Sequence, residues 1–128
     1  MSAREVVESF WAAMAANDWD AAASLFADDA TIEWPCSGER FPSPAAWAEV
    51  QRRYPAAGRW RFDVHRLVVD GEVAVSETTV SDGEQQARVL AVSEVDGDRI
   101  ARLVEYWPEA YEPPEWRRDL TERVAPIP

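Results

Sequence analysis

The residues best suited to chemistry are two glutamates on predicted strands, Glu105 and Glu77. Side chains alternate between the two faces of a strand, so parity shows which residues share a face. Glu105 shares its face with Leu103 and Trp107, and Glu77 shares its face with Val75. Apolar surroundings raise the pKa of a carboxyl group, which suits a general acid or base at neutral pH. We predict Glu105 as the principal acid or base and Glu77 as a second polar group; the alternative is that both are solvated charges at the rim.

The face that Arg88 takes depends on the lengths of the two flanking turns. With two-residue turns, Arg88 lies between Glu77 and Glu105 in a row across one face of the sheet. With three-residue loops, Val89 takes that middle place and Arg88 points outward. The pattern by itself leaves both registers open.

Four further residue positions have a chemical and a structural interpretation. His65, the only histidine, could move a proton near neutral pH, or it could be a half-exposed strand residue. Glu33 and Trp34 face opposite ways, and we favour Trp34 as an aromatic wall over Glu33 as a base. Cys36, the only cysteine, has no obvious activating base. With one histidine and one cysteine we predict no metal site, and we predict no cofactor.

Four β-rich runs between residues 60 and 107 carry most of these candidates. Asp-Gly dipeptides separate the runs at residues 70–71, 82–83 and 96–97. Asp-Gly between two such runs is the strongest short signal of a hairpin, because the tight turn needs positive φ. The spacing therefore predicts a four-stranded antiparallel meander.

Three helices and one short strand are predicted before the meander. A capping box at the start of the chain begins a helix over 2–16, and a second helix follows over 19–27. A strand over 30–34 is followed by a loop, and Ser-Pro then begins a third helix over 43–54. The order ααβαββββ predicts an α+β fold with the helices on one side of a bent antiparallel sheet.

The prolines that follow the meander exclude another long strand. We predict one domain over residues 1–128, in which 108–128 form a Pro-rich C-terminal extension with a short helix over 115–124. Seven tryptophans in so small a chain indicate an aromatic-walled interior or a large interface.

The charge of the chain excludes several classes of partner. A net charge of −11 argues against nucleic acid and against anionic membrane surfaces. No apolar run approaches the roughly 18 residues that a membrane span requires. The single cysteine excludes an intramolecular disulfide framework, and the first residues lack the pattern of a signal peptide. These features together predict a cytoplasmic protein.

Two stretches resemble the NTF2-like superfamily, in particular its SnoaL-like and ketosteroid-isomerase-like members. They are AANDWDAAASLFADDATIEW at 15–34 and DGDRIARLVEYW at 96–107. The resemblance implies an NTF2-like cone, in which a strongly bent sheet wraps around three helices and encloses an apolar pocket. It does not imply one activity, because this scaffold hosts isomerases, cyclases, hydrolases and non-catalytic binding modules.

The residues expected from the best-known activities are mostly replaced. The general base of ketosteroid isomerases falls at Trp34, their oxyanion-hole tyrosine at Phe10 and their protonated aspartate near Ala91. The usual isomerase mechanism is therefore excluded. In the limonene-epoxide-hydrolase-like pattern, the last-strand aspartate falls at Glu105, whereas the arginine and second aspartate fall near Glu77 and Thr79. Only one acid of that set is retained.

The resemblance also favours the register that places Val89 inside. We predict that an apolar, cyclic small molecule contacts Trp34, Trp47, Trp107, Phe10, Val89 and His65, and that it undergoes cofactor-independent isomerisation, cyclisation or epoxide opening. The alternative is a non-catalytic ligand-binding or dimerisation module. In this register the outward face of the sheet carries Leu90, Val92, Val104 and Tyr106, which predicts a homodimer.

Overall fold

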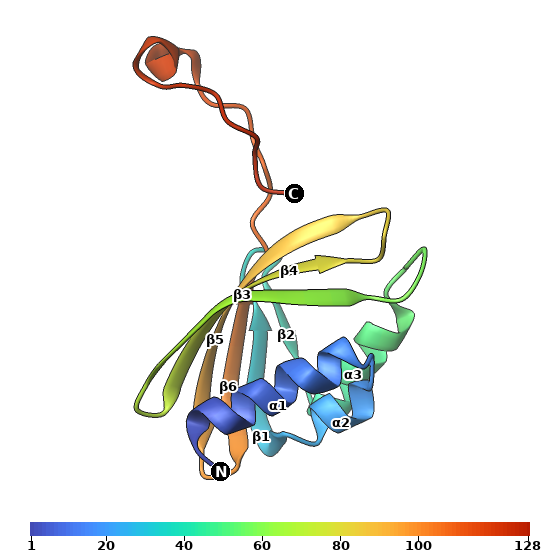
Figure 1. Cartoon of the computed structure of the whole chain (residues 1–128). Helices are drawn as coiled ribbons and strands as arrows, with labels where there is room; N and C mark the ends of the chain where they lie inside the picture. The colour runs from blue at the N-terminus through green and yellow to red at the C-terminus, as the bar shows by residue number, and fades with distance from the viewer.

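Three helices lie against one side of a six-stranded sheet that curls without closing in the computed structural model, which describes residues 1–128 (Figure 1). The helices are α1 (Ala3–Ala15), α2 (Trp19–Ala23) and α3 (Pro44–Arg53). The strands lie in the order β2-β1-β6-β5-β4-β3. Their bounds are Phe26–Trp34 for β1, Glu39–Phe41 for β2, Arg61–Asp70 for β3, Val73–Ser81 for β4, Gln86–Asp96 for β5 and Arg99–Tyr106 for β6. The predicted α+β fold with its four-stranded meander is confirmed.

The Asp-Gly dipeptides form the turns of the meander, but not all in the same way. The first and third give two-residue turns that begin at Gly71 and Gly97, where φ is +60° and +61°. Glycine adopts positive φ without steric cost. The middle loop is longer, because Ser81 pairs with Gln86 across residues 82–85.

Long-range pairing moves the boundaries of β1 and α2 away from the predicted ones. The second helix ends at Ala23 instead of residue 27, and Phe26 already belongs to β1. Phe26 pairs with Ile100 of β6, whose N–H donates to the carbonyl of Leu25 at 2.8 Å. β1 runs parallel to β6, so the sheet is mixed instead of wholly antiparallel. β2 lies within the segment that the sequence predicts to be a loop. It is a strand because it pairs with β1.

The inner face of β4 carries small and hydroxyl side chains. Ser76 and Thr78 are buried, whereas Glu77 points to the outer face. Helix α1 crosses the sheet here, and Trp11 Nε1 donates to Ser76 Oγ at 3.2 Å. Small residues leave room for that helix. The prediction that Glu77 faces the interior is therefore wrong.

Asp82 ties two loops together at the open end of the sheet. Its carboxylate accepts from the backbone N–H groups of Ala57 at 2.8 Å, Glu84 at 2.9 Å and Gln85 at 2.8 Å. The side chain of Gln85 also donates to it at 2.8 Å. These hydrogen bonds hold the pKa of Asp82 well below its usual range. The carboxylate thus fixes the α3–β3 loop against the β4–β5 loop.

Asp82→Asn is expected to destabilise the fold at pH 7. In the variant, the asparagine NH2 group takes the place of the oxygen that accepts from the Ala57 N–H and the Gln85 side chain. Those two hydrogen bonds are lost, and donor groups then face each other. We expect the melting temperature to fall on the order of 5 °C. Because the folded-state pKa is depressed, the stabilisation is present above the unfolded pKa of 3.8 and is lost as pH falls through the folded value. Thermal melts at pH 7 and pH 3 test this, with Asp70→Asn as the exposed control. An unchanged melting temperature for Asp82→Asn at pH 7 contradicts it.

Residues beyond β6 extend away from the sheet and helices as an arm (Figure 1). The arm contains a 3-10 helix, η1 (Glu115–Leu120), which is shorter than the predicted helix over 115–124. Its large apolar side chains, at Tyr111, Trp116, Leu120 and Val124, are exposed. None of the helices is long and apolar enough to span a bilayer.

Candidate active site

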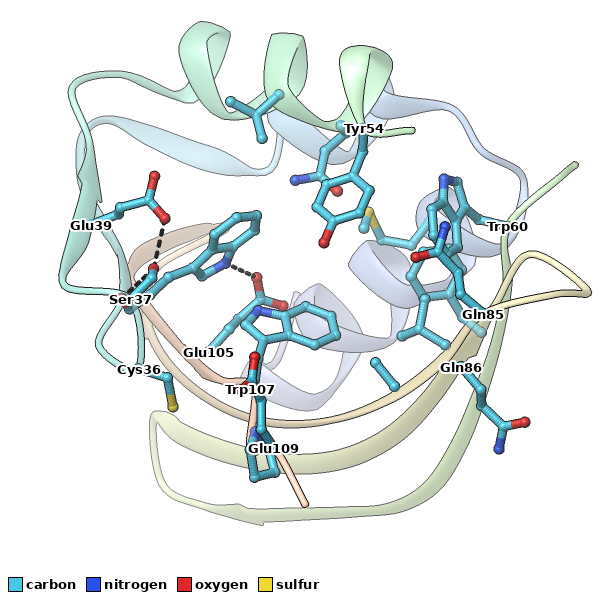
Figure 2. A pocket seen from close by; sticks show the side chains of 18 of the residues that line it. Cys36, Ser37, Glu39, Tyr54, Trp60, Gln85, Gln86, Glu105, Trp107 and Glu109 are labelled. Atoms are coloured by element: carbon cyan, nitrogen blue, oxygen red, sulfur yellow. Dashed lines mark hydrogen bonds between the residues drawn. The ribbon is translucent and has the colours of Figure 1, made fainter. Parts of the chain in front are cut away.

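A cavity of about 750 Å³ opens between the helices and the curled end of the sheet (Figure 2). Twelve of its twenty lining residues are hydrophobic. Glu105 and Trp107 lie on one side, and Tyr54 and Trp60 face them (Figure 2). The size and the apolar lining are typical of a small-molecule site. The aromatic side chains of the wall are Trp11, Trp19, Trp34, Tyr54, Trp60, Phe62 and Trp107.

Glu105 is a buried carboxyl group in this wall. It lies on the inner face of β6, directly opposite Ala91, and is 3% exposed. Its Oε1 accepts a hydrogen bond from Trp34 Nε1 at 3.1 Å, shown dashed in Figure 2, while Oε2 has no hydrogen-bond partner in the protein. Burial raises the pKa of Glu105 from 4.5 to about 7, and the Trp34 hydrogen bond opposes that rise. The group can therefore give or take a proton near neutral pH.

Two tryptophans form a corner around this carboxyl. The rings of Trp34 and Trp107 are nearly perpendicular, at 79°, with centroids 6.1 Å apart. Phe41 of β2 packs edge-on against Trp34 at 4.8 Å. The unpredicted strand β2 thus fixes the orientation of the indole that bonds Glu105. As predicted, Trp34 points inward, and Glu33 points outward to Arg40 and Arg102.

Asn17 positions the opposite wall. It sits between α1 and α2 with a φ of +55°, in the left-handed region that asparagine tolerates. Its side chain accepts from the backbone N–H of Trp60 at 3.0 Å and donates to the carbonyl of Trp60 at 2.8 Å. The pattern of the chain identifies Asn17 only as a helix breaker. Its second role, holding Trp60 in the cavity wall, depends on a contact 43 residues away.

Several predicted site residues lie outside the cavity on the outer face of the sheet. Glu77 contacts Arg66 Nε at 3.2 Å and Arg88 Nη1 at 3.3 Å. Arg88 points outward and Val89 inward, as in the favoured register, although the middle loop has four residues. His65 bonds Thr79 Oγ1 at 2.6 Å on that same outer side and does not line the cavity.

Three other predicted ligand contacts belong to the hydrophobic core. Phe10, Trp47 and Val89 are at most 1% exposed and none of them lines the cavity. Phe10 and Trp47 pack together with centroids 5.8 Å apart. They support the wall from behind, because Phe10 also packs edge-on against the cavity residue Trp11 at 5.2 Å. Of the eight predicted site residues, the cavity brings together Glu105, Trp34 and Trp107.

Cys36 and two further glutamates are exposed residues that line the cavity. Cys36 is exposed, and Glu39 accepts a hydrogen bond from Ser37 Oγ at 2.6 Å. Glu109 follows β6 at the start of the arm and also lines the cavity. No group of three or more His, Cys, Asp or Glu side chains is arranged to hold a metal ion.

Trp34→Phe is expected to raise the pKa of Glu105 above its value of about 7. The substitution keeps the aromatic wall but removes the indole N–H that favours the charged carboxylate. The carboxyl ¹³C shift of Glu105, followed by NMR against pH, measures the change. Trp19→Phe, elsewhere in the wall, is the matched control and is expected to leave that pKa unchanged. A lower pKa in Trp34→Phe contradicts the assigned role of the hydrogen bond.

Comparison with known families identifies the scaffold. Residues 7–103 match the model of the SnoaL-like domain, which is well over half of the chain. The chain belongs to the SnoaL-like family. A comparison with curated proteins finds no match. The resemblance seen in the sequence is therefore confirmed at the level of the family and its NTF2-like fold.

Solved structures similar to this SnoaL-like protein have diverse names. A "putative ketosteroid isomerase" from Kribbella flavida superposes with a TM-score of 0.84 at 31% identity, over 96% of this chain and 90% of that one. An LEH-like epoxide hydrolase from M. tuberculosis gives 0.67 at 26% identity, over 83% and 82%. A "putative polyketide cyclase" from Sinorhizobium meliloti gives 0.67 at 25% identity, over 79% and 93%. Proteins with different names thus share the SnoaL-like scaffold. The chemistry of this chain must therefore be inferred from its own site.

Proposed function

We propose that this SnoaL-like protein binds an apolar, cyclic small molecule and transfers a proton to or from it through Glu105. The observation that carries the proposal is the buried carboxyl group in the cavity wall. It is 3% exposed, its pKa is about 7, and one of its oxygens has no partner in the protein. A carboxyl group with these properties is suited to isomerisation, cyclisation or epoxide opening.

The composition of the cavity supports an apolar ligand. Most of its lining side chains are hydrophobic, and seven of them are aromatic. A volume of about 750 Å³ is large enough for a fused ring system. The similar structures named as an isomerase, an epoxide hydrolase and a polyketide cyclase are consistent with small-molecule chemistry on this scaffold.

A screen of cyclic ketones, enones and epoxides tests the proposal. We expect turnover whose pH dependence has an apparent pKa near 7, and a loss of at least about 100-fold in Glu105→Gln. Glu77→Gln, on the outer face, is the matched control and should keep the activity. Turnover that Glu105→Gln preserves would contradict the role of Glu105. Ligands that bind without turnover would favour the alternative, a non-catalytic binding module.

The outer face of the sheet supports a second proposal, that the protein forms a homodimer. Val68, Val75, Val92 and Val104 pair across four adjacent strands. Val68 is 62% exposed and Val75 is 42% exposed in the single chain. Val104 is only 8% exposed, so Val68 and Val75 form the part of this row that is suited to burial against a second copy.

Light scattering at micromolar concentration is expected to give about twice the chain mass of 14.4 kDa. Val75→Glu places a charge in the middle of the row and should give a monomer. Leu120→Glu alters an exposed apolar residue on the arm and should leave the dimer intact. A monomeric wild type, or a dimer lost only in Leu120→Glu, contradicts the sheet interface.

A further inference from the structure

We propose that the ligand of the cavity carries a protonated amine, which lies beside Glu105 and among the tryptophan rings. The inference rests on the proposed function, since it concerns the same cavity and names the class of molecule that enters it.

Every charged side chain that lines the cavity is acidic. Glu39, Glu105 and Glu109 contribute carboxyl groups, and no arginine is among the lining residues. The chain contains thirteen arginines and no lysine, and its net charge is −11. A cleft lined by one sign of charge concentrates ligands of the opposite sign and repels ligands of its own sign. An anionic ligand is therefore disfavoured.

Glu105 differs from the other inward or half-buried glutamates in having no cationic partner. Glu33 lies between Arg40 and Arg102, and Glu77 lies between Arg66 and Arg88. The groups nearest Glu105 on the neighbouring strands are Trp34 of β1 and Ala91 of β5. The other ionisable groups of the cavity are Glu39, Glu109, Tyr54 and Cys36. None of them supplies a positive charge to Glu105.

The tryptophan corner provides a second type of contact for a cation. A cation is attracted to the face of an indole ring within about 6 Å of its centroid. Trp34 and Trp107 present perpendicular faces whose centroids are 6.1 Å apart, next to the carboxyl group. Figure 2 shows Trp107 beside Glu105, with the open space of the cavity between them and Tyr54 and Trp60. An ammonium group there contacts a ring face and Glu105 Oε2, while the apolar body of the ligand contacts the other aromatic residues.

A bound ammonium group also determines the state of Glu105. Burial holds the pKa of the carboxyl near 7 in the free protein, so part of the population is protonated at neutral pH. An ammonium group favours the ionised carboxylate, which makes Glu105 a base instead of an acid in the complex. Binding of the amine must then release a proton. The affinity for the amine is lost as pH falls below 7, by up to about tenfold per pH unit.

Calorimetric titration with three ligands of one ring system tests the inference. The probes are 1-naphthylmethylamine, the neutral 1-naphthylmethanol and the anionic 1-naphthoate. At pH 8 we expect the amine to bind at least about tenfold more tightly than the alcohol, with the acid weakest. Repeating the amine titration at pH 6.5 in two buffers of different ionisation enthalpy should reveal proton release, and the alcohol should release none.

Variants test whether Glu105 is the carboxyl group responsible for the preference for the amine over the alcohol. Glu105→Gln should bring the amine and the alcohol within about twofold of each other without changing the affinity for the alcohol. Glu77→Gln should leave the amine preference unchanged. A preference lost in the Glu39→Gln/Glu109→Gln double variant but kept in Glu105→Gln would overturn the placement. Proton release by wild type is a separate test if Glu105→Gln does not fold.

The outcomes separate this inference from the proposed function. Equal or tighter binding of the alcohol by wild type would overturn the amine preference and leave an apolar ligand for the cavity. Failure of all three probes to bind would overturn both. Amine binding with no turnover of any amine-bearing ring compound would support the inference and contradict proton transfer as the function.

Discussion

Glu105→Gln is expected to stabilise the folded protein at pH 8 while removing its proposed proton-transfer group. The pKa of Glu105 is about 7 in the folded state and 4.5 in the unfolded state. Because the folded pKa is raised, the favourable contribution is fully present below pH 4.5 and is lost as pH rises through 7. The difference corresponds to about 3 kcal/mol of lost stability above pH 7, and a neutral glutamine avoids this cost.

Urea unfolding at two pH values measures this effect. The advantage of Glu105→Gln over wild type should grow by about 2.5 kcal/mol between pH 5 and pH 8. Glu77→Gln, whose carboxylate lies between two arginines on the outer face, should show no such gain. A variant that is less stable than wild type at pH 8 would indicate that Glu105 is ionised at little cost. The assignment of Glu105 as a buried acid with a raised pKa would then be wrong.

Trp47→Ala is expected to destabilise the fold by about 4 kcal/mol. Trp47 of α3 is fully buried and packs against Phe10 and Phe26, with centroids at 5.8 and 5.2 Å. Removing its indole leaves a void that close-packed neighbours cannot fill. The same substitution at Trp107, which is half-buried and faces the cavity, should cost less than half as much.

The two tryptophan variants also separate a core residue from a ligand contact. Urea unfolding gives their stabilities, and titration with 1-naphthylmethanol under folding conditions gives their affinities. Trp107→Ala should weaken binding, whereas folded Trp47→Ala should bind much as wild type does. A stable Trp47→Ala protein with weakened binding would indicate that Trp47 contacts the ligand, as the sequence predicts.

The sequence identifies most of the fold because its local signals agree with one another. The capping box at Ser2 and the Ser-Pro at residues 43–44 begin helices as predicted, and the Asp-Gly sites form the turns. What local patterns miss is pairing at long range. β2 has three residues and forms only because β1 lies beside it, and the start of β1 depends on Ile100.

The candidate site is predictable only in part, for the same reason. Parity places Glu105 and Trp107 inward correctly, since the pairing of β6 is regular from Arg102 to its end at Tyr106. It fails for Glu77, because the more apolar face of β4 is the exposed one and the hydroxyl-bearing face packs under α1. The facing wall with Trp60 comes from loops and helix ends, whose positions have no periodic signal.

The position of Cys36 offers a route to the unidentified ligand. It is the only thiol of the chain, it is exposed, and it is among the residues that line the cavity. A library of small disulfides exchanged with this thiol at equilibrium would enrich those fragments whose free ends fit the cavity, because noncovalent contacts stabilise the mixed disulfide. Mass spectrometry of the intact protein would identify the captured fragments without a functional assay. The chain thus contains its own attachment point for fragment selection.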